Sequence, residues 1–328
     1  MRFFDGLHSS LTPRLAAAGF WAAFAMFAGS AAAQDYPSRP IRIVVPFPAG
    51  GGTDVVARAL GERASQVLKQ PVIIDNKPGA NGMIGTEAVA RAPNDGYTLL
   101  FTINSHVLST LLYKKPAYRL EDFTPISVIA NVYLGLFYSP AKLGDGSPQE
   151  VLARLRHKDA TYASWGMGSL AHLYGEHLAK VGALPLMHVP YKGETDMVSG
   201  MLSGEVDTGI FGAQAATRFT DGKAKMLAIA APARLSSLPE VPTFGELGIK
   251  SMDRGTFIGL LAPARTPAPI VRLWEGVVKD ALKDAAFTQR LKTLYMEPSG
   301  SNSAEFAKVI EDDRALWGPV IKRLDISF

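Results

Sequence analysis

A glycine-rich segment at residues 46–54 (PFPAGGGTD) is the most specific chemical feature of the sequence. It separates a strand expected at 41–45 from a helix expected at 55–68. Consecutive glycines let the backbone approach a ligand closely, and the free N–H groups at a helix start attract anions. The segment therefore predicts an anion site, and the alternative is an ordinary turn capped by Thr53, with Asp54 complementing the helix dipole.

The segment matches neither of the common nucleotide-binding motifs. Thr53, Asp54 and Val55 follow Gly52 where a dinucleotide fingerprint needs a third glycine. A phosphate-binding P-loop needs Gly-Lys-Ser or Gly-Lys-Thr, which does not occur at this position. Nucleotide binding is therefore not expected here.

Two further segments place hydroxyl groups and glycines at strand ends. Residues 164–169 (SWGMGS) again lead from an expected strand into an expected helix, and residues 102–105 (TINS) follow another strand. Open α/β sheets bind ligands at the carboxyl ends of their strands. One such helix start in each half of the chain would hold a molecule with two polar ends, whereas the alternative for each segment is a capped or solvated turn.

The sequence contains no recognisable catalytic or metal-binding motif. Neither Gly-x-Ser-x-Gly nor His-Glu-x-x-His occurs, and without cysteine there is no thiolate nucleophile, disulfide or zinc thiolate. His172 and Glu176 share a helix face, where a satisfied histidine is favoured over a metal ligand. His106 and His188 are expected beside loops or strand ends without an evident carboxylate partner. No enzyme activity and no cofactor are expected.

Composition describes a folded chain with no preference for nucleic acid. With 47% hydrophobic and 20% charged residues, the 328-residue sequence is unlike disordered proteins. Its length suggests two domains. The 34 basic and 30 acidic residues are interleaved and leave a net charge of +4, whereas nucleic-acid-binding proteins gather basic residues into stripes.

The first 33 residues differ from the rest and predict a signal peptide. Arg2 and Arg14 precede an apolar run at 15–28, and Ala31-Ala32-Ala33 supplies the small residues of a cleavage site. The alternative is an uncleaved membrane anchor, since the apolar stretch approaches the length that spans a bilayer. Export is the favoured interpretation.

The elements that position the three segments follow from hydrophobic periodicity. Apolar runs alternate with helical patterns, which predicts an α/β protein with two doubly wound lobes. A capping box at 147–150 opens one of the helices. Strands are expected at 41–45, 72–74, 97–102, 126–130, 133–138, 161–164, 186–189, 207–211, 225–230 and 256–261. Helices are expected at 55–68, 83–91, 148–157, 170–181 and 195–202, and from about 268 and 303.

Short motifs in order along the chain resemble the Bug family, the substrate-binding proteins of tripartite tricarboxylate transporters. These motifs cover essentially the whole chain after the signal peptide. They are 36–41 (YPSRPI), 45–51 (VPFPAGG), 76–82 (NKPGANG), 95–99 (DGYTL), 162–164 (YAS) with 168–169 (GS) and 172–173 (HL), 188–193 (HVPYKG), 238–243 (LPEVPT) and 259–263 (GLLAP).

The resemblance implies a periplasmic binding protein with two lobes, a type II Venus flytrap without catalytic activity. Residues 1–33 would be the signal peptide, 34–132 and 256–328 the first lobe, and 133–255 the second. Such a monomeric receptor would capture a small carboxylate, with aromatic carboxylates and dicarboxylates among the candidates, in the cleft between its lobes. It would deliver this ligand to membrane permease subunits.

In that family, main-chain N–H groups, hydroxyls and bridging waters hold the carboxylates. The residues carried over for one end of the ligand are Phe47, Ala49, Gly50, Gly51, Thr53, Thr102 and Ser105. Those for the other end are Ser164, Trp165, Gly166, Gly168, Ser169, Phe211 and Gly212.

Three positions depart from the family pattern and bear on the ligand. Trp165 and Met167 stand where relatives often have small or polar residues, and Gly212 stands where many carry aspartate. Without that carboxylate a ligand ammonium has no obvious partner. Trp165 and Met167 would favour a bulky apolar ligand if they face the cleft, and packing beneath the helix is the equal alternative.

Two other functions fit parts of the sequence. A subunit that presents a ligand to the ectodomain of a signalling sensor would need the same closing cleft. A secreted hydrolase would need a Ser-His pair that the motif search does not detect, with Ser169 as the residue to test. The transport receptor is favoured.

Overall fold

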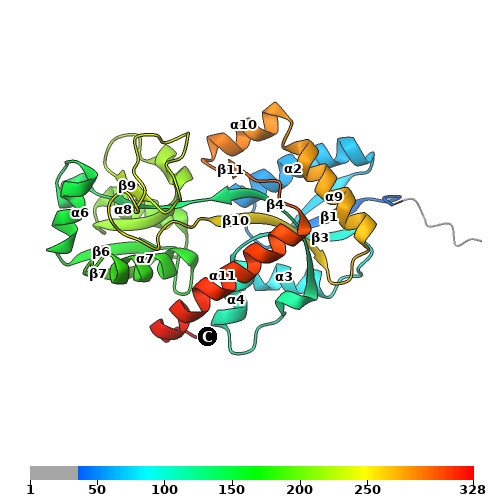
Figure 1. The fold of residues 1–328 in the computed structure, drawn as a ribbon, viewed down its shortest axis with the longest axis horizontal. Helices are drawn as coiled ribbons and strands as arrows, with labels where there is room; N and C mark the ends of the chain where they lie inside the picture. The colour runs from blue at the N-terminus through cyan, green and yellow to red at the C-terminus, as the bar shows by residue number, and fades with distance from the viewer. Residues whose placement is uncertain (1–35) are drawn as a thin grey trace, which may run out of the picture. The chain divides into compact units, whose positions relative to one another are not determined.

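The computed structural model describes residues 36–328, so the predicted signal peptide, residues 1–33, lies outside the described residues. Residues 39–328 form one compact unit. Within the described part, no helix is both long and apolar enough to cross a membrane. The expected α/β class is confirmed, because helices alternate with the strands of two mixed sheets (Figure 1).

The first sheet holds the glycine-rich segment at its edge. Within residues 36–328 its strands follow the order β11-β4-β10-β3-β1-β2. They are β1 (Ile41–Val45), β2 (Val72–Asn76), β3 (Thr98–Ile103), β4 (Phe123–Val132), β10 (Thr256–Pro263) and β11 (Glu297–Pro298). Strand β1 is parallel to both β2 and β3, whereas β10 is antiparallel to β3 and β4. The carboxyl ends of β1, β2 and β3 therefore share one edge.

The second sheet repeats this arrangement with different neighbours. Its described strands follow the order β7-β6-β8-β5-β9. They are β5 (Leu134–Tyr138), β6 (Ala160–Ser164), β7 (Leu186–Pro190), β8 (Thr208–Gly212) and β9 (Lys225–Ile229). Strand β6 is parallel to β7 and β8, whereas β5 is antiparallel to β8 and β9. The carboxyl ends of β6, β7 and β8 therefore meet at one edge.

Helices cover both sheets. The α-helices in the described part are α2 (Gly52–Leu68), α3 (Met83–Ala90), α4 (Ser105–Leu112), α5 (Pro140–Leu143), α6 (Pro148–Arg156), α7 (Leu170–Val181), α8 (Glu194–Ser203), α9 (Ala268–Ala281), α10 (Ala285–Thr293) and α11 (Ser303–Leu324). Short 3₁₀ helices are η1 (Ala80–Gly82), η2 (Leu120–Asp122) and η3 (Ala213–Arg218). The capping box at Ser147 and Glu150 is confirmed. Helices α4 and α10 were not expected, because each is short and α4 is buried on most of its surface.

The chain passes between the two sheets twice, at adjacent positions. Strand β4 leads directly into β5, and the segment after β9 returns to the first sheet as β10 (Figure 1). At Gly255, just before β10, a Cβ atom would lie 2.5 Å from the carbonyl oxygen of Val132 and 2.6 Å from the ring of Tyr133. Only glycine therefore lets the two crossings approach this closely.

One hydrophobic cluster joins helices from both parts of the chain. It includes Leu112 of α4, Leu173 of α7, and Trp317 and Ile321 of α11. The C-terminal helix α11 thus packs with elements that precede and follow the first crossing, and Figure 1 shows it running beside α4. Burial of these side chains provides the main stabilisation at this junction.

His106 is an unusual buried group in α4. Its side chain is 1% exposed, stacked 5.4 Å from the Tyr118 ring and edge-on at 4.7 Å to Phe123. Neither ring nitrogen has a hydrogen-bond partner among residues 36–328. Burial lowers the pKa of His106 to about 3, so the imidazole is neutral in the folded protein at neutral pH.

We expect His106 to make stability depend on pH. Because the unfolded histidine has a pKa near 6.5, the unfolded state binds more protons than the folded state between about pH 6.5 and pH 3. Stability should therefore fall as the pH drops through this window. In His106→Phe, urea unfolding from pH 7 to pH 4 should show a shallower fall. The exposed His157→Phe is the control, and an unchanged slope in His106→Phe would contradict the assignment.

Candidate functional site

The buried carboxylate of Asp54 holds the glycine-rich loop between β1 and α2. It is 2% exposed and accepts hydrogen bonds from the Gly50 N–H at 2.8 Å, from Arg58 Nε at 2.9 Å and from Asn76 Nδ2 at 2.9 Å. Burial by itself would raise the pKa of Asp54, but these three donors and the charge of Arg58 outweigh burial and lower it. Asp54 is therefore ionised, and it fixes the loop from beneath.

This arrangement changes which N–H groups could bind an anion. The Gly50 N–H points to Asp54, so it is not free for a ligand. Helix α2 begins at Gly52, and its N-cap is Gly51, which has no side chain to form a capping bond. Thr53 is the second residue of the helix, so it is not the cap. The N–H groups of Gly52 and Thr53 in the first turn lack intrahelical acceptors and lie at the positive end of the helix dipole.

The other residues predicted for this end surround the same edge. Ala49, Gly50 and Gly51 are exposed, and the half-buried Phe47 ring packs over the Gly82 position. The 102–105 segment is buried rather than solvated, with Thr102 0% and Ser105 6% exposed. Because β1 and β3 are parallel neighbours, both segments lie at the same sheet edge.

The 164–169 loop at the end of β6 is also held by buried acceptors. Ser169 is the N-cap of α7, and its hydroxyl accepts the His172 N–H at 3.2 Å. The Gly168 N–H donates to His172 Nδ1 at 3.1 Å. The Ser164 hydroxyl lies 2.6 Å from His188 Nε2 and accepts the Gly166 N–H at 3.2 Å. Several donors predicted for the ligand thus already have partners within the loop.

Two stacked histidines lie beneath this loop. The rings of His172 and His188 are 4.0 Å apart between centroids, and the Tyr162 ring stacks on His188 at 5.0 Å. Burial, together with the charge of a protonated His172, lowers the pKa of His188 to about 4. Burial also lowers the pKa of His172, although Glu176 opposes this shift. Both rings are therefore neutral near pH 7.

From the sequence, His172 was expected to be a satisfied helix-face histidine and His188 to have no evident carboxylate partner. The structure brings the two together because α7, which carries His172, packs against β7, which carries His188. No local sequence signal links the two residues, since the contact depends on how the helix packs on the sheet. The Ser164 side chain is 0% exposed, so the Ser164–His188 pair does not present an accessible nucleophile.

The remaining predicted residues occupy different environments. Trp165 is half-buried and packs against hydrophobic clusters of the second sheet, whereas the Met167 side chain is 54% exposed. Phe211 is 0% exposed and packs edge-on to Phe137 at 5.4 Å, so its ring belongs to the core. Phe211 therefore presents no exposed group to a ligand.

Two polar residues that sequence analysis missed lie next to Gly212. Gln214 of η3 follows β8, and its Nε2 donates to Glu194 Oε2 at 3.4 Å. Glu194 is the first residue of α8 and follows β7. A signal was present, since both residues lie within a few residues of the ends of expected strands. Their pairing depends on the side-by-side placement of these strand ends.

A segment between α10 and β11 links the two sheet edges. A Cβ atom at Gly52 would lie 3.3 Å from Met296 Cε. Tyr295 packs against a hydrophobic cluster that contains Ala213, and the Ala213 N–H donates to Tyr133 O at 2.9 Å. The segment therefore contacts the start of α2 and the hydrophobic cluster that includes Ala213.

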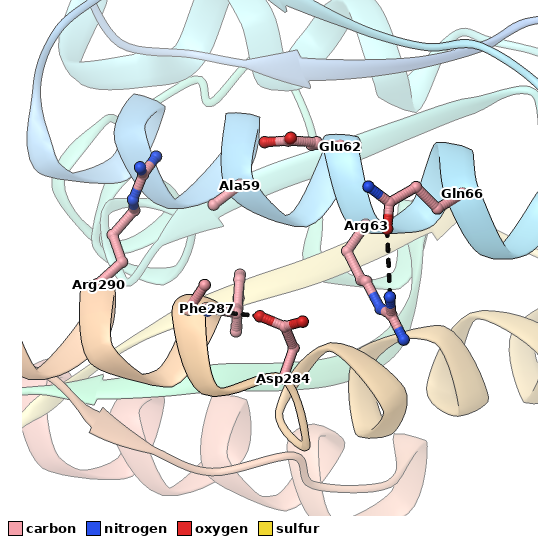
Figure 2. Close-up of a pocket in the computed structure, with 8 residues that line it drawn as sticks. Ala59, Glu62, Arg63, Gln66, Asp284, Phe287 and Arg290 are labelled. Carbon is pink, nitrogen blue, oxygen red and sulfur yellow. Dashed lines mark hydrogen bonds between the residues drawn. The ribbon is translucent and has the colours of Figure 1, made fainter.

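The cavity in Figure 2 lies elsewhere, between α2 and α10. Its volume is about 210 Å³, and two of its charged groups serve the fold: Arg63 pairs with Asp280 at 2.8 Å, and Asp284 caps α10 by accepting the Phe287 N–H. It contains none of the predicted site residues. Among residues 36–328, no group of three or more His, Cys, Asp or Glu side chains is arranged to hold a metal ion.

A family model described as the tripartite tricarboxylate transporter family receptor matches residues 56–326. The chain belongs to this family. The expected resemblance to Bug proteins is confirmed, and the family is one of solute-binding receptors.

Three solved structures are similar to the chain over most of its length. The periplasmic binding protein BugD is 31% identical, with 89% of this chain and 99% of BugD covered and a TM-score of 0.76. MatC from Rhodopseudomonas palustris, solved with bound malate, is 28% identical, with coverages of 87% and 100% and a TM-score of 0.75. An R. palustris protein solved with adipate is 30% identical, with coverages of 89% and 99% and a TM-score of 0.79. The fold is that of two-lobe periplasmic binding proteins.

Asp54→Asn should loosen the loop of this receptor. The asparagine side chain keeps the shape of aspartate but loses its charge. Its NH₂ group would face N–H groups that donate to the carboxylate of Asp54. A hydrogen bond to a charged group contributes about 1.5–3 kcal/mol, so urea unfolding should show destabilisation of about that size. The control is Asp75→Asn, which removes surface ion pairs with Arg42 and Lys77 and should cost less than about 1 kcal/mol. Equal effects of the two substitutions would contradict the role of Asp54.

Ligand affinity should fall at acid pH as the histidines beneath the 164–169 loop become protonated. A protonated His172 cannot accept the Gly168 N–H, and two stacked cations repel each other. Calorimetry from pH 7 to pH 4 should show a fall toward pH 4, where His188 titrates. The fall in affinity should be smaller in His188→Gln than in the parent protein. Titration of the ligand itself affects both proteins equally, so it does not account for the difference. His177→Gln is the control, and identical profiles for all three proteins would exclude the histidine effect.

Proposed function

We propose that this receptor binds a small carboxylate in the cleft between its lobes and delivers it to the permease of a tripartite tricarboxylate-type transporter. The observation that carries the proposal is the start of α2. Its first-turn N–H groups lack intrahelical acceptors, and Asp54 holds the glycine loop beside them open. The malate and adipate bound by two similar proteins support a carboxylate as the ligand class.

The first carboxylate binds at the edge formed by β1 and β3. The N–H groups of Gly51, Gly52 and Thr53 and the hydroxyl of Thr53 donate to it. Thr102 and Ser105 lie at the same edge, and Phe47 borders it. Gly50 has a different role from the one expected: with φ +84° and its N–H directed to Asp54, it shapes the loop.

The far end of the ligand meets the edge formed by β6 and β8. Candidate contacts there are the main chain of Gly212 and the hydroxyl of Ser169, which can donate while it caps α7, whereas the Gly166 N–H already donates to Ser164 Oγ. Trp165 borders this edge. The lobes are proposed to comprise 34–132 with 256–328, and 133–255, and to close on the ligand by bending at the two crossings.

The periplasm is the proposed location, with residues 1–33 as the cleaved signal. The mature receptor is proposed to act as a monomer and to present its closed, loaded form to the membrane subunits. Ligand that binds only the folded protein raises its stability by about 2.7 kcal/mol when free ligand is 100 times the dissociation constant. A thermal-shift screen of mono- and dicarboxylates, including aromatic ones, is therefore the first assay.

Substitutions in the loop separate main-chain capture of the carboxylate from charge pairing. At Gly51 a Cβ atom would meet only Pro48 O at 3.7 Å, so Gly51→Val should fold normally and obstruct the ligand. Thr53→Ala removes a hydroxyl donor and should weaken binding by about tenfold or more. Lys192→Ala, which removes an exposed cation, should have less effect.

Calorimetry with the best ligand of the screen measures these affinities. Gly276→Val, the same change on the exposed face of α9, is the matched control. If Gly51→Val and Thr53→Ala bind like the parent protein while Lys192→Ala does not bind, a side-chain cation recognises the carboxylate and the proposed site is wrong.

A further inference from the structure

Two hydrogen-bond acceptors meet at the ends of β7 and β8 without enough donors to satisfy them. Glu194 begins α8 after β7, and Gln214 lies in η3 after β8. Strands β7 and β8 both pair in parallel with β6, so these ends share the edge that carries Ser164. The 3.4 Å contact from Gln214 Nε2 to Glu194 Oε2 joins them.

The amide of Gln214 folds back onto the main chain of Gly212. A Cβ atom at position 212 would lie 2.2 Å from Gln214 Oε1 and 2.4 Å from Nε2. The amide therefore fills the space that a side chain at the end of β8 would take. Glycine at 212 is what allows Gln214 to place its polar group there.

The oxygen of this amide is an acceptor without a donor. Gln214 Oε1 is buried and has no hydrogen-bond partner among residues 36–328. Buried polar atoms are nearly always paired, and an unpaired one marks strain or a missing partner. The amide NH₂ is turned toward Glu194, so the covered oxygen lacks a donor, and a ligand that displaced the groups over it could supply one.

Glu194 adds a second acceptor with little compensation. Its side chain forms no ion pair within 4.0 Å among the described residues, and Gln214 supplies its hydrogen bond. Burial raises the pKa of Glu194, while the charge of Arg218 and the Gln214 amide act in the opposite direction. The pair therefore offers several acceptor positions and a single donor group, the Gln214 NH₂.

The pair lies beside the proposed ligand path. Ala213, next to Gln214, belongs to the hydrophobic cluster against which Tyr295 packs, and the neighbouring Met296 contacts the Gly52 position at the start of α2. A ligand whose carboxylate binds at α2 can thus extend along this segment toward Gln214.

We propose that Gln214 and Glu194 accept a hydrogen bond from an O–H or N–H group at the far end of the ligand. The inference rests on the proposed carboxylate site and narrows its ligand to hydroxy- or amino-substituted carboxylates. Glu194, at the start of α8 after β7, then supplies the carboxylate that position 212 lacks, so an amino substituent on the ligand would have a partner. A site built to hydrogen-bond a substituent discriminates strongly against the analogue that lacks it.

The test compares matched ligands that differ only in the donor. The sets are succinate, malate and aspartate; glutarate, 2-hydroxyglutarate and glutamate; and adipate, 2-hydroxyadipate and 2-aminoadipate. Calorimetry on the mature protein should show a hydroxy or amino member bound at least about tenfold more tightly than the unsubstituted member of its set. A hydroxy ligand identifies an O–H donor, and an amino ligand an ammonium.

Two variants assign this preference to the pair. Gln214→Leu removes the amide, and Glu194→Gln removes the charge at constant size. Each should weaken the substituted ligand by about tenfold or more and change the unsubstituted one by less than about threefold. The loss in Glu194→Gln should be larger for an amino than for a hydroxy ligand. Glu205→Gln, the same change at an exposed residue just after the C-cap of α8, is the control.

The outcomes separate this inference from the proposed function. If no carboxylate of the panel binds, both fail. If unsubstituted carboxylates bind as well as substituted ones, or if both folded variants keep the preference, the receptor function stands and the role of Gln214 and Glu194 is wrong. Thermal unfolding without ligand verifies that both variants fold, and a defect in one leaves the other to decide.

Discussion

The carboxylate of Asp54 sets the shape of the loop on which the proposed anion site depends. Three donors from different parts of the chain converge on it: the Gly50 main chain, Arg58 one helical turn later, and Asn76 at the end of β2. Without this ionised group the glycine-rich loop would lose its tie to the neighbouring strand. A loop of three glycines is entropically costly to order, so a strong buried acceptor is the means of fixing it.

In the second sheet, neutral side chains rather than a charged one hold the corresponding loop. Beneath the 164–169 loop, His172 accepts the Gly168 N–H and His188 contacts the Ser164 hydroxyl. His172 Nδ1 accepts the Gly168 N–H only while it is unprotonated. One half of the site is therefore fixed by a carboxylate that stays charged and the other by a histidine that must stay uncharged, which gives the two halves different responses to acid.

Both loops use part of their own main-chain donors internally. Gly50 and Gly168 direct their N–H groups to side chains of the protein rather than outward. The donors left for a ligand are those of the first turn of α2 and the capping hydroxyl of Ser169. At the far end the balance is reversed, since Gln214 and Glu194 offer acceptors. A ligand with a carboxylate at one end and a donor at the other matches this polarity.

The sequence by itself determined the elements whose signals are local. Helix α7 was predicted with its observed bounds, because its apolar periodicity and the Ser169 cap lie within the element. The capping box of α6 and strand β1 were likewise readable from neighbouring residues. The family and the α/β class also followed from motifs in sequence order. The lobe bounds and the predicted contacts with the ligand stay predictions.

Only the tertiary structure decided which side chains meet. Helix α4 escaped detection because it is short and buried on most sides, so it has no polar face to give a period. The stacking of His172 on His188, the burial of Phe211 among other rings and the folding of Gln214 over Gly212 all depend on strands that are neighbours in space. A sequence pattern shows which face of one helix or strand is buried. These contacts depend instead on the register between several strands and helices, and the packing of the whole chain sets that register.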